Sequence, residues 1–291
     1  MCQSACPERA IETVDGSVRV DPSKCNGCML CVAACPTETL QSPRGDFLQV
    51  LEELSESNEP VLGCSSQESA RGHGRVECLG QLGMEHWIAL RVFVRGTLIV
   101  NATACSSCPR RAALEPVRQE VESVARLQLG EGAADLRMME DPRGVEYRPT
   151  VGDRRWLFRS LERRIARRLS DSLDRRPTTE SAGAVKTCPE RTRFLAAALE
   201  RLPSDWRDAA KRACLPRIRL TETCNDCGRC ASICPTGALA KKIQGGERSL
   251  ATTPTRCNAC GICVSFCSRN GIEVEPGRIQ QDEERLGIQT R

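Results

Sequence analysis

The chain has 291 residues, a length typical of two or three domains, and it contains 20 cysteines beside only two histidines and 3% aromatic residues. Its formal net charge of +4 counts every cysteine as neutral, so it gives little support to a nucleic-acid partner, and we expect none. No segment reaches about 18 consecutive apolar residues, because the nearest, from Trp87 to Val100, is interrupted by Arg91 and Arg95; we therefore expect no membrane span.

The cysteines occur in tight runs with gaps of two and three residues. This spacing suits metal clusters better than the crossbridges of a secreted disulfide framework. The first residues, MCQSACPERAI, lack the basic segment and the apolar segment of a secretory signal. We therefore expect a reducing, cytoplasmic compartment.

The first motif is C-x2-C-x2-C-x3-C-P, from Cys25 to Pro36, and it is preceded by Cys2-x3-Cys6-Pro7. A cubane 4Fe-4S cluster takes four thiolates, one for each iron. A C-x2-C-x2-C loop can supply three of them, while the fourth cysteine leads into a helix that carries it to a different cluster. One complete set is expected here, consisting of Cys6, Cys25, Cys28 and Cys31.

Cys2 and Cys35 are left as half of a second cluster in this segment, residues 1–43. Cys2 and Cys6 match the third and fourth ligands of a motif whose first two cysteines are absent. We therefore expect that the true chain starts upstream, where C-x-x-C-x would complete a fourth 4Fe-4S site. The alternative is a degenerate domain that holds a single cluster.

Residues 44–130 alternate between helical and strand patterns, which predicts a small α/β domain with a parallel sheet. The expected helices are 47–54, 84–94 and 110–129, and the expected strands are 60–64, 75–78 and 97–103.

Four cysteines of this domain, Cys64, Cys78, Cys105 and Cys108, each follow a predicted strand. Because the carboxyl ends of parallel strands open on one edge, the four thiols can converge on a single site. The site can hold a further iron–sulfur cluster such as 2Fe-2S, a structural zinc, or a redox-active dithiol at Cys105 and Cys108. The helix that starts near Arg110 would lower the pKa of that dithiol. Unrelated buried thiols are the remaining alternative.

Residues 131–215 are rich in charged residues, and we expect a linker with helices. One helix, Trp156 to Leu173, carries an apolar stripe that can pack on this chain, on an acidic partner subunit or on a membrane surface. Cys188 and Cys214 have no partner in the sequence and are expected to be ordinary thiols. His73 and His86 are expected to be surface residues rather than ligands.

Residues 216–278 contain two further motifs with C-x2-C-x2-C-x3-C spacing and are followed by a tail, residues 279–291. With exchanged fourth ligands, the first predicted set is Cys224, Cys227, Cys230 and Cys267. The second predicted set is Cys257, Cys260, Cys263 and Cys234. Structural zinc is a poor alternative, because zinc sites use two separated C-x2-C pairs.

The segments CNDCGRCASICPTGAL and CNACGICVSFCSRNGI resemble the bacterial two-cluster ferredoxins over about residues 220–275. Residues 1–43 resemble a truncated domain of the same type. The middle is similar, through VLGC, RVECLG and CSSCP, to the small iron–sulfur subunit of methyl-viologen-reducing hydrogenases. This second resemblance implies an additional cluster at the four middle cysteines.

The expected architecture is α+β, with ferredoxin-like dicluster modules on either side of a small α/β domain and a helical linker. The expected function is an electron-transfer protein or subunit that relays electrons through three complete 4Fe-4S clusters to redox partner proteins or oxidoreductase subunits. No nucleotide-binding, flavin or hydrolase motif is present, so we expect no small-molecule substrate and no catalysis by the chain itself.

Two alternatives to this function remain open. One is a redox enzyme whose middle dithiol or cluster is fed by the ferredoxin modules, and the other is an assembly subunit whose clusters are structural.

Overall fold

The structure is a computed structural model that describes residues 2–15, 17–42, 46–144, 147, 186–244 and 247–277. All of these residues belong to one compact unit of the chain. The predicted helix from Trp156 to Leu173 and the tail, residues 279–291, lie outside the described residues. Within the described ranges, no helix has both the length and the apolar character needed to cross a membrane.

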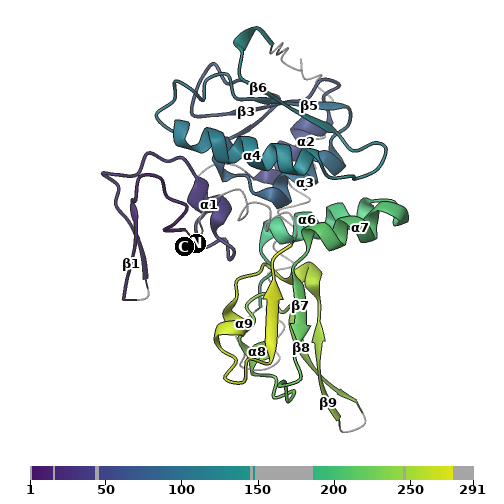
Figure 1. The fold of residues 1–291 in the computed structure, drawn as a ribbon. Coiled ribbons are helices and arrows are strands. Elements are labelled where there is room, and N and C mark those ends of the chain that lie inside the picture. Colours follow the sequence, from purple (N-terminus) through teal and green to yellow (C-terminus); the bar gives the residue numbers. More distant parts are fainter. Residues whose placement is uncertain are drawn as a thin grey trace, which may run out of the picture. The chain divides into compact units, whose positions relative to one another are not determined.

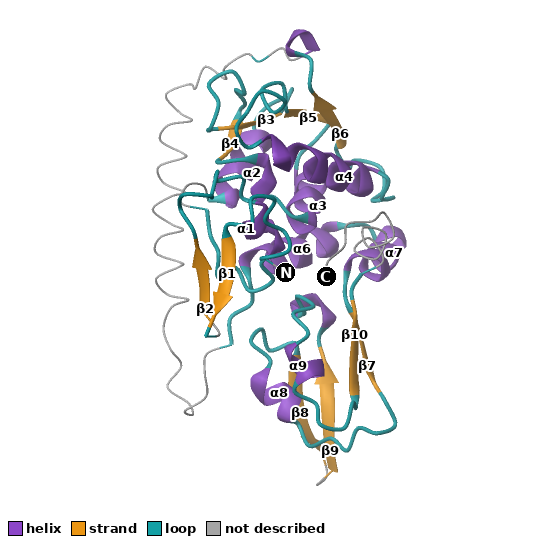
Figure 2. Ribbon diagram, turned by 60° about the vertical axis from the view of Figure 1, so that its left-hand side comes forward, coloured by secondary structure: helices purple, strands orange, loops and turns teal. Residues whose placement is uncertain are grey.

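The N-terminal segment begins with a hairpin of β1 (Ile11–Val14) and β2 (Ser17–Val20), which pair antiparallel (Figure 2). The short helix α1 (Leu30–Ala34) follows. Ile11 is buried while β2 is exposed along its whole length, so only one strand of the hairpin faces the interior.

The middle of the chain forms a four-stranded sheet in the order β4-β3-β5-β6, in which every neighbouring pair is parallel. The strands are β3 (Val61–Cys64), β4 (Gly74–Val76), β5 (Thr97–Asn101) and β6 (Asp135–Met139). Three helices lie on one side of this sheet (Figures 1 and 2): α2 (Phe47–Ser55), α3 (Met84–Phe93) and α4 (Leu114–Ala125). The predicted parallel α/β arrangement of this region is therefore present.

The helical layer fixes the core of the middle region. Trp87 of α3 is fully buried, and its indole Nε1 donates a hydrogen bond to Glu120 of α4 at 3.2 Å. Arg91, also on α3, donates to the carbonyl oxygens of Val124 and Leu127, both at 2.7 Å. A cation placed at the last carbonyls of a helix stabilises that end, so Arg91 holds the end of α4 on the core.

The described part of the range expected to be a linker with helices contains one strand and two α-helices. Strand β6 pairs with β5 along its whole length, and α6 (Glu190–Arg201) packs against α3 through Leu195 and Leu199. Exposed Asp135 and Arg137 alternate with buried Leu136 and half-buried Met138, which is the pattern of a half-buried strand, although only over five residues. Pairing with β5 along its whole length makes this short segment the edge strand of the sheet.

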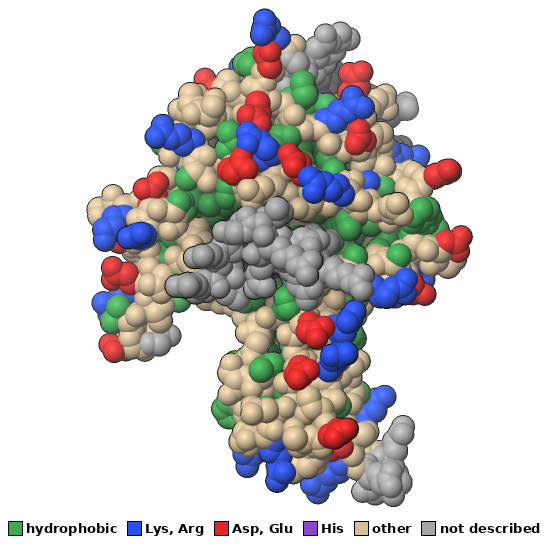
Figure 3. All heavy atoms as spheres, in the orientation of Figure 1, with side chains coloured by type: hydrophobic (Ala, Val, Ile, Leu, Met, Phe, Trp, Pro, Cys, Tyr) green, Lys and Arg blue, Asp and Glu red, His purple; other side chains and the backbone are tan. Residues whose placement is uncertain are grey.

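Helix α7 (Ser204–Cys214) leads from α6 into the C-terminal segment. There, β7 (Arg217–Leu220) pairs antiparallel with β10 (Ile272–Glu275), and β8 (Leu239–Gln244) pairs antiparallel with β9 (Glu247–Thr252). The short helices α8 (Arg229–Ile233) and α9 (Ile262–Ser265) follow the two cysteine loops. Figure 3 shows acidic and basic side chains interspersed on the face that it draws.

Candidate metal centres

The three C-x2-C-x2-C loops share one backbone conformation. In each loop the residue two positions after the first cysteine and the residue four positions after it have positive φ. They are Gly27 and Met29 (73° and 65°), Asp226 and Gly228 (52° and 69°), and Ala259 and Gly261 (54° and 72°). Non-glycine residues rarely adopt this conformation, so its repetition at equivalent positions indicates a shared structural requirement.

The four cysteines that stand last in their motifs, and are expected to serve the neighbouring cluster, also share their surroundings. They are Cys6, Cys35, Cys234 and Cys267. The residue three positions after each has positive φ, and these residues are Arg9 (50°), Glu38 (52°), Gly237 (69°) and Asn270 (51°). This turn directs backbone amides towards the sulfur. The N–H of Ala10 donates to Cys6 Sγ at 3.2 Å, and the N–H of Gly271 donates to Cys267 Sγ, also at 3.2 Å.

These hydrogen bonds affect the acidity of the thiols. Backbone N–H groups of Arg269 and Gly271 lower the pKa of Cys267. Burial alone would raise the pKa of Cys234, but hydrogen bonds from the hydroxyl of Thr236 and from nearby amides outweigh it, and the pKa is lowered. Hydrogen bonds that favour the thiolate suit a cysteine that must bind iron as its anion.

The N-terminal set of four thiols is gathered at one place. Burial raises the pKa of Cys31, and the charges of Cys28, Cys25 and Cys6 raise it further. These are the four residues that the exchanged ligand pattern predicts, with Cys6 contributed from the other motif.

One C-terminal set is gathered in the same way. Burial raises the pKa of Cys263 to about 11, with further contributions from Cys257, Cys260 and Cys234. Here too the fourth thiol comes from the neighbouring motif.

The other C-terminal set encloses a cavity. A space of about 270 Å³ is lined by all four of its cysteines, Cys224, Cys227, Cys230 and Cys267. Four soft sulfur donors around one such space form a donor set that fits a cubane cluster.

Cys35 has the surroundings of a cluster ligand, although the sequence pattern places only one other cysteine, Cys2, in the same incomplete set. Burial would raise its pKa, but hydrogen bonds from the amides of Leu40, Thr37 and Thr39 and from the Thr37 hydroxyl outweigh it, and the pKa is lowered. Cys234 has equivalent partners at the same spacing. Cys35 therefore keeps the geometry of an exchanged ligand.

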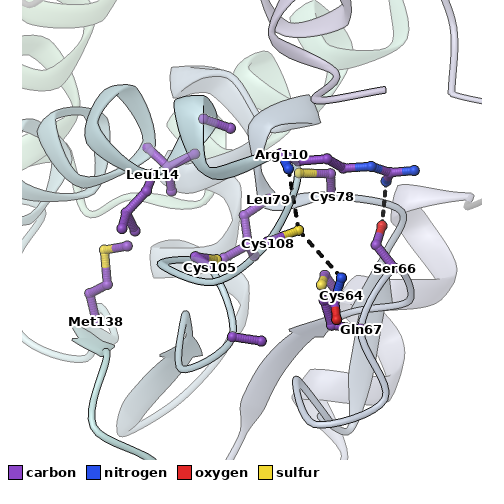
Figure 4. A pocket seen from close by; sticks show the side chains of 13 residues that line it. Cys64, Ser66, Gln67, Cys78, Leu79, Cys105, Cys108, Arg110, Leu114 and Met138 are labelled. Atoms are coloured by element: carbon purple, nitrogen blue, oxygen red, sulfur yellow. Dashed lines mark hydrogen bonds between the residues drawn. The ribbon is translucent and has the colours of Figure 1, made fainter. Parts of the chain in front are cut away.

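The four middle cysteines, which lie in or after strands β3, β4 and β5, line a single cavity at the carboxyl edge of the parallel sheet (Figure 4). They are Cys64, Cys78, Cys105 and Cys108. The cavity has a volume of about 20 Å³, roughly the space of one water molecule. Gln67 Nε2 and the backbone N–H of Arg110 both donate to Cys108 Sγ at 3.4 Å.

The prediction that a helix lowers the pKa of a dithiol at Cys105 and Cys108 is wrong for Cys105. Its burial raises the pKa to about 12, and burial raises that of Cys78 to about 11. The regular helix α4 begins only at Leu114, after the 3₁₀ turn Arg111–Ala113, too far along the chain for its first turn to reach Cys105. A thiol this far from ionisation is a poor nucleophile at neutral pH.

Several residues beside the cysteines carried no sequence signal. Arg110 forms an ion pair with Glu77 at 3.4 Å and donates to the hydroxyl of Ser66, above the middle cavity (Figure 4). His73 and His86, expected at the surface, are both partly buried, and each accepts a backbone N–H through Nδ1. Arg110 and His73 contact residues that are distant in the sequence, so no local sequence pattern predicts their positions.

The described residues contain no group of three or more His, Cys, Asp or Glu side chains arranged to hold a single metal ion. A cubane spreads its four thiolates over four separate irons and therefore needs a wider arrangement.

Comparison with known proteins agrees with this geometry. Residues 18–41 match the family of 4Fe-4S binding domains, and residues 217–268 match the family of 4Fe-4S dicluster domains. Both ends of the chain carry ferredoxin domains. The middle, residues 44–130, lies outside both matches, so its resemblance to hydrogenase subunits depends on its cysteine motifs alone.

A stretch of 40 residues is 50% identical to the putative oxidoreductase AegA of Escherichia coli (strain K12), a match that spans 14% of this chain and 6% of that relative. No solved structure matches the chain. The ferredoxin domains and this short match support iron–sulfur electron transfer by the two ends of the chain. When bound, a cubane with four cysteine ligands accepts and donates single electrons and leaves no iron open to a substrate.

Proposed function

We propose that the chain is a relay with three complete 4Fe-4S sites in two ferredoxin modules and a fourth metal site in an α/β domain between them. The modules comprise residues 1–43 and 216–278, and the α/β domain comprises residues 44–130 together with strand β6. The relay belongs to an oxidoreductase complex in which another subunit performs the bond chemistry.

The observation that carries this proposal is the repetition of one loop geometry together with exchanged fourth ligands. Three loops have positive φ at the same two positions, and each predicted set includes a thiol from the neighbouring motif. Such a geometry has no use in a thiol protein without clusters, because it collects four mutually repelling thiolates that only a bound metal group neutralises.

The middle site is proposed to hold an iron–sulfur cluster, with 2Fe-2S as the smaller alternative to a cubane. Four thiols from three strands of a parallel sheet lie around one space, and soft thiolate donors suit an iron–sulfur cluster. The volume of this cavity, about 20 Å³ against about 270 Å³ at the Cys224 site, favours the smaller 2Fe-2S cluster over a cubane. The raised pKa of Cys105 argues against a free redox-active dithiol at this position.

Both ferredoxin modules offer a contact point for redox partners. Cys25 of the first module and Cys227 of the second are exposed, whereas most other site cysteines are partly or fully buried. An exposed ligand brings its cluster close to the surface, where a partner protein can exchange electrons with it. The two ends of the relay can therefore serve a donor and an acceptor.

Dye-mediated redox titration of the anaerobically reconstituted chain tests this function. We expect each cluster to be reduced and reoxidised reversibly by small dyes. Clusters that form but exchange no electrons with any dye would contradict the relay and favour a structural role. Steady turnover of a disulfide substrate that is abolished by Cys105→Ala would instead favour an enzyme at the middle site.

A further inference from the structure

The loop that holds Cys25 and Cys28 contacts the middle domain through Asn26. The Oδ1 of Asn26 accepts the N–H of Cys28 at 3.0 Å and so closes the loop around the cluster site. Its Nδ2 donates outward to the carbonyl oxygen of Pro109 at 3.2 Å, and also to Glu8 at 3.0 Å. Pro109 directly follows Cys108, a thiol of the middle site.

The equivalent residue of the last motif makes the same pair of contacts. Asn258 Oδ1 accepts the N–H of Cys260 at 3.4 Å, and Asn258 Nδ2 donates to the carbonyl oxygen of Pro36. Pro36 directly follows Cys35. In both cases the asparagine of a C-N-x-C loop bonds to the proline of a Cys-Pro pair that belongs to another cysteine site.

Asparagine is suited to this double task. Its carboxamide presents an acceptor and two donors at the end of a short side chain. Aspartate can accept the loop N–H but has no hydrogen to donate to a carbonyl oxygen. Serine can form the local turn but is too short to reach outward as well.

The first junction is packed as well as hydrogen-bonded. Cys28, Cys78 and Ala113 form one buried cluster, in which a ligand of the N-terminal site lies beside a thiol of the middle site. The guanidinium Nε of Arg110 donates to the carbonyl oxygen of Asn26 at 3.1 Å, while its Nη1 pairs with Glu77. The N-terminal site and the middle site are thus joined by a hydrogen bond donated from each of them, by Asn26 in one direction and by Arg110 in the other.

We propose that Asn26 and Asn258 are positioning residues that arrange the cysteine sites of this chain in series. Asn26 holds the N-terminal site (Cys6, Cys25, Cys28 and Cys31) against the middle site. Asn258 holds the site of Cys257, Cys260, Cys263 and Cys234 against Cys35. The inference builds on the relay function proposed above, and it adds which sites are neighbours and which side chains keep them so.

The third loop provides a matched control. Asn225 has the same position between Cys224 and Cys227, but it is exposed, and no hydrogen bond across a junction is found for it among the described residues. A substitution at Asn225 therefore changes a C-N-x-C loop in which the asparagine makes no hydrogen bond to another cysteine site among the described residues.

The experiment measures hydrogen–deuterium exchange in the reconstituted full-length chain and in Asn26→Asp, Asn258→Asp and Asn225→Asp. At positions 26 and 258, aspartate keeps the acceptor that closes the loop and removes the amide donor, which at Asn26 also bonds to Glu8. We expect faster exchange at residues 104–112 in the Asn26 variant and at residues 35–42 in the Asn258 variant. The Asn225 variant should leave both segments unchanged, and all three should keep the wild-type iron content. Serine variants at the same positions repeat the test without an added charge.

A second readout follows the cluster sites directly. In the reduced protein, we expect the magnetic interaction between the N-terminal and middle centres, seen by electron paramagnetic resonance, to be lost in Asn26→Asp and kept in Asn225→Asp. Unchanged exchange at a junction segment in both the aspartate and serine variants overturns the proposal for that asparagine. Equal loss of iron at all three positions also overturns it, since the side chain would then act only within its own loop. Absence of metal at the middle site would contradict the proposed function but would leave the exchange test of both junctions intact.

Discussion

Gly80 lies where the middle domain and the N-terminal loop approach most closely. A Cβ atom at this position would lie 2.3 Å from the carbonyl oxygen of Cys28 and 3.0 Å from the Cβ of Ala113. The first of these neighbours is backbone and cannot rotate away. The contact between the two cysteine sites therefore requires a residue without a side chain.

We predict that Gly80→Ala displaces the Cys28 loop and lowers the free energy of unfolding by about 1–3 kcal/mol, the usual cost of overpacking. Denaturant unfolding followed through the buried Trp87 measures this change. Gly83→Ala is the control, because its added Cβ would come close only to the end of the flexible Glu85 side chain, at 3.1 Å, and would lie at ordinary contact distance from the Ala33 carbonyl oxygen and Arg191, at 3.6 and 3.7 Å. A loss of stability at Gly83 as large as that at Gly80 would contradict the proposed close contact.

His86 is a second residue whose environment has a measurable consequence. Its ring packs against Phe47 at 4.5 Å between centroids, and its Nδ1 accepts the N–H of Gly83. Burial, and then the charge of Arg191, lower its pKa from the ordinary 6.5 to about 3. Below pH 6.5 the unfolded chain therefore takes up a proton that the folded chain excludes.

We predict that the stability of the protein falls as the pH is lowered from about 6.5 towards 3, with His86 contributing up to about 1.4 kcal/mol per pH unit. An asparagine side chain at this position would still accept the N–H of Gly83 but cannot take up a proton, so His86→Asn should lower stability at neutral pH and flatten this slope. Unfolding midpoints measured between pH 7 and 5 test the difference in slope. Parallel pH profiles for the two proteins would show that His86 titrates normally in the folded state.

At the scale of the structural elements, a short helix precedes each exchanged cysteine of the C-terminal segment, whereas the sequence pattern predicted a helix after it. Cys234 follows α8, and its sulfur lies near Cys257 and Cys263 of the next loop rather than with the loop that precedes it. The short helices α8 and α9 therefore carry the fourth ligand from one loop to the other. Under the proposed ligand assignment, each loop needs a cysteine from the other to complete its site.

We predict that Cys234→Ala damages the cluster held by Cys257, Cys260 and Cys263 and leaves the cluster of Cys224, Cys227 and Cys230 intact. Iron analysis combined with electron paramagnetic resonance of the reduced protein distinguishes the two. Cys214→Ala, which removes a thiol that is buried in α7 and outside every set, should change neither spectrum. Loss of the cluster held by Cys224 to Cys230 would show instead that each motif closes on itself.

At the scale of the whole molecule, the number of bound metals follows from the number of complete thiol sets. Three sets have the composition and arrangement of cubane sites, and the middle cavity provides a fourth group of four thiols. The middle group differs from the others because its cysteines come from separate strands instead of one loop. Its metal should therefore be lost independently of the other three.

We predict that the reconstituted chain binds about 12 iron atoms in cubanes, with additional metal at the middle site. The double variant Cys105→Ala, Cys108→Ala should lose the additional metal and keep about 12 iron atoms. Metal analysis and Mössbauer spectroscopy measure both quantities. A total of about 8 iron atoms or fewer, or zinc in the C-terminal motifs, would contradict the assignment of ligands.

The local chemistry of this protein could be predicted from sequence alone. The spacing of cysteines within a loop fixes which thiols can reach one cluster, because only a few bonds separate them. In the N-terminal set, the spacing groups Cys25, Cys28 and Cys31, and only the position of Cys6 depends on a longer-range contact. The alternation of helix and strand in residues 44–130 likewise predicted the parallel sheet.

The tertiary structure decided the features that join distant parts of the chain. Strand β6 joins the sheet from beyond the expected α/β domain by pairing with β5, and the four middle thiols meet because parallel strands end on one edge. Asn26 contacts a residue 83 positions away, and Asn258 contacts one 222 positions away. No local pattern encodes such contacts, since they depend on how complete elements pack. The sequence by itself thus determined the separate cysteine sites, and only the packing of the folded chain determined which of them are neighbours.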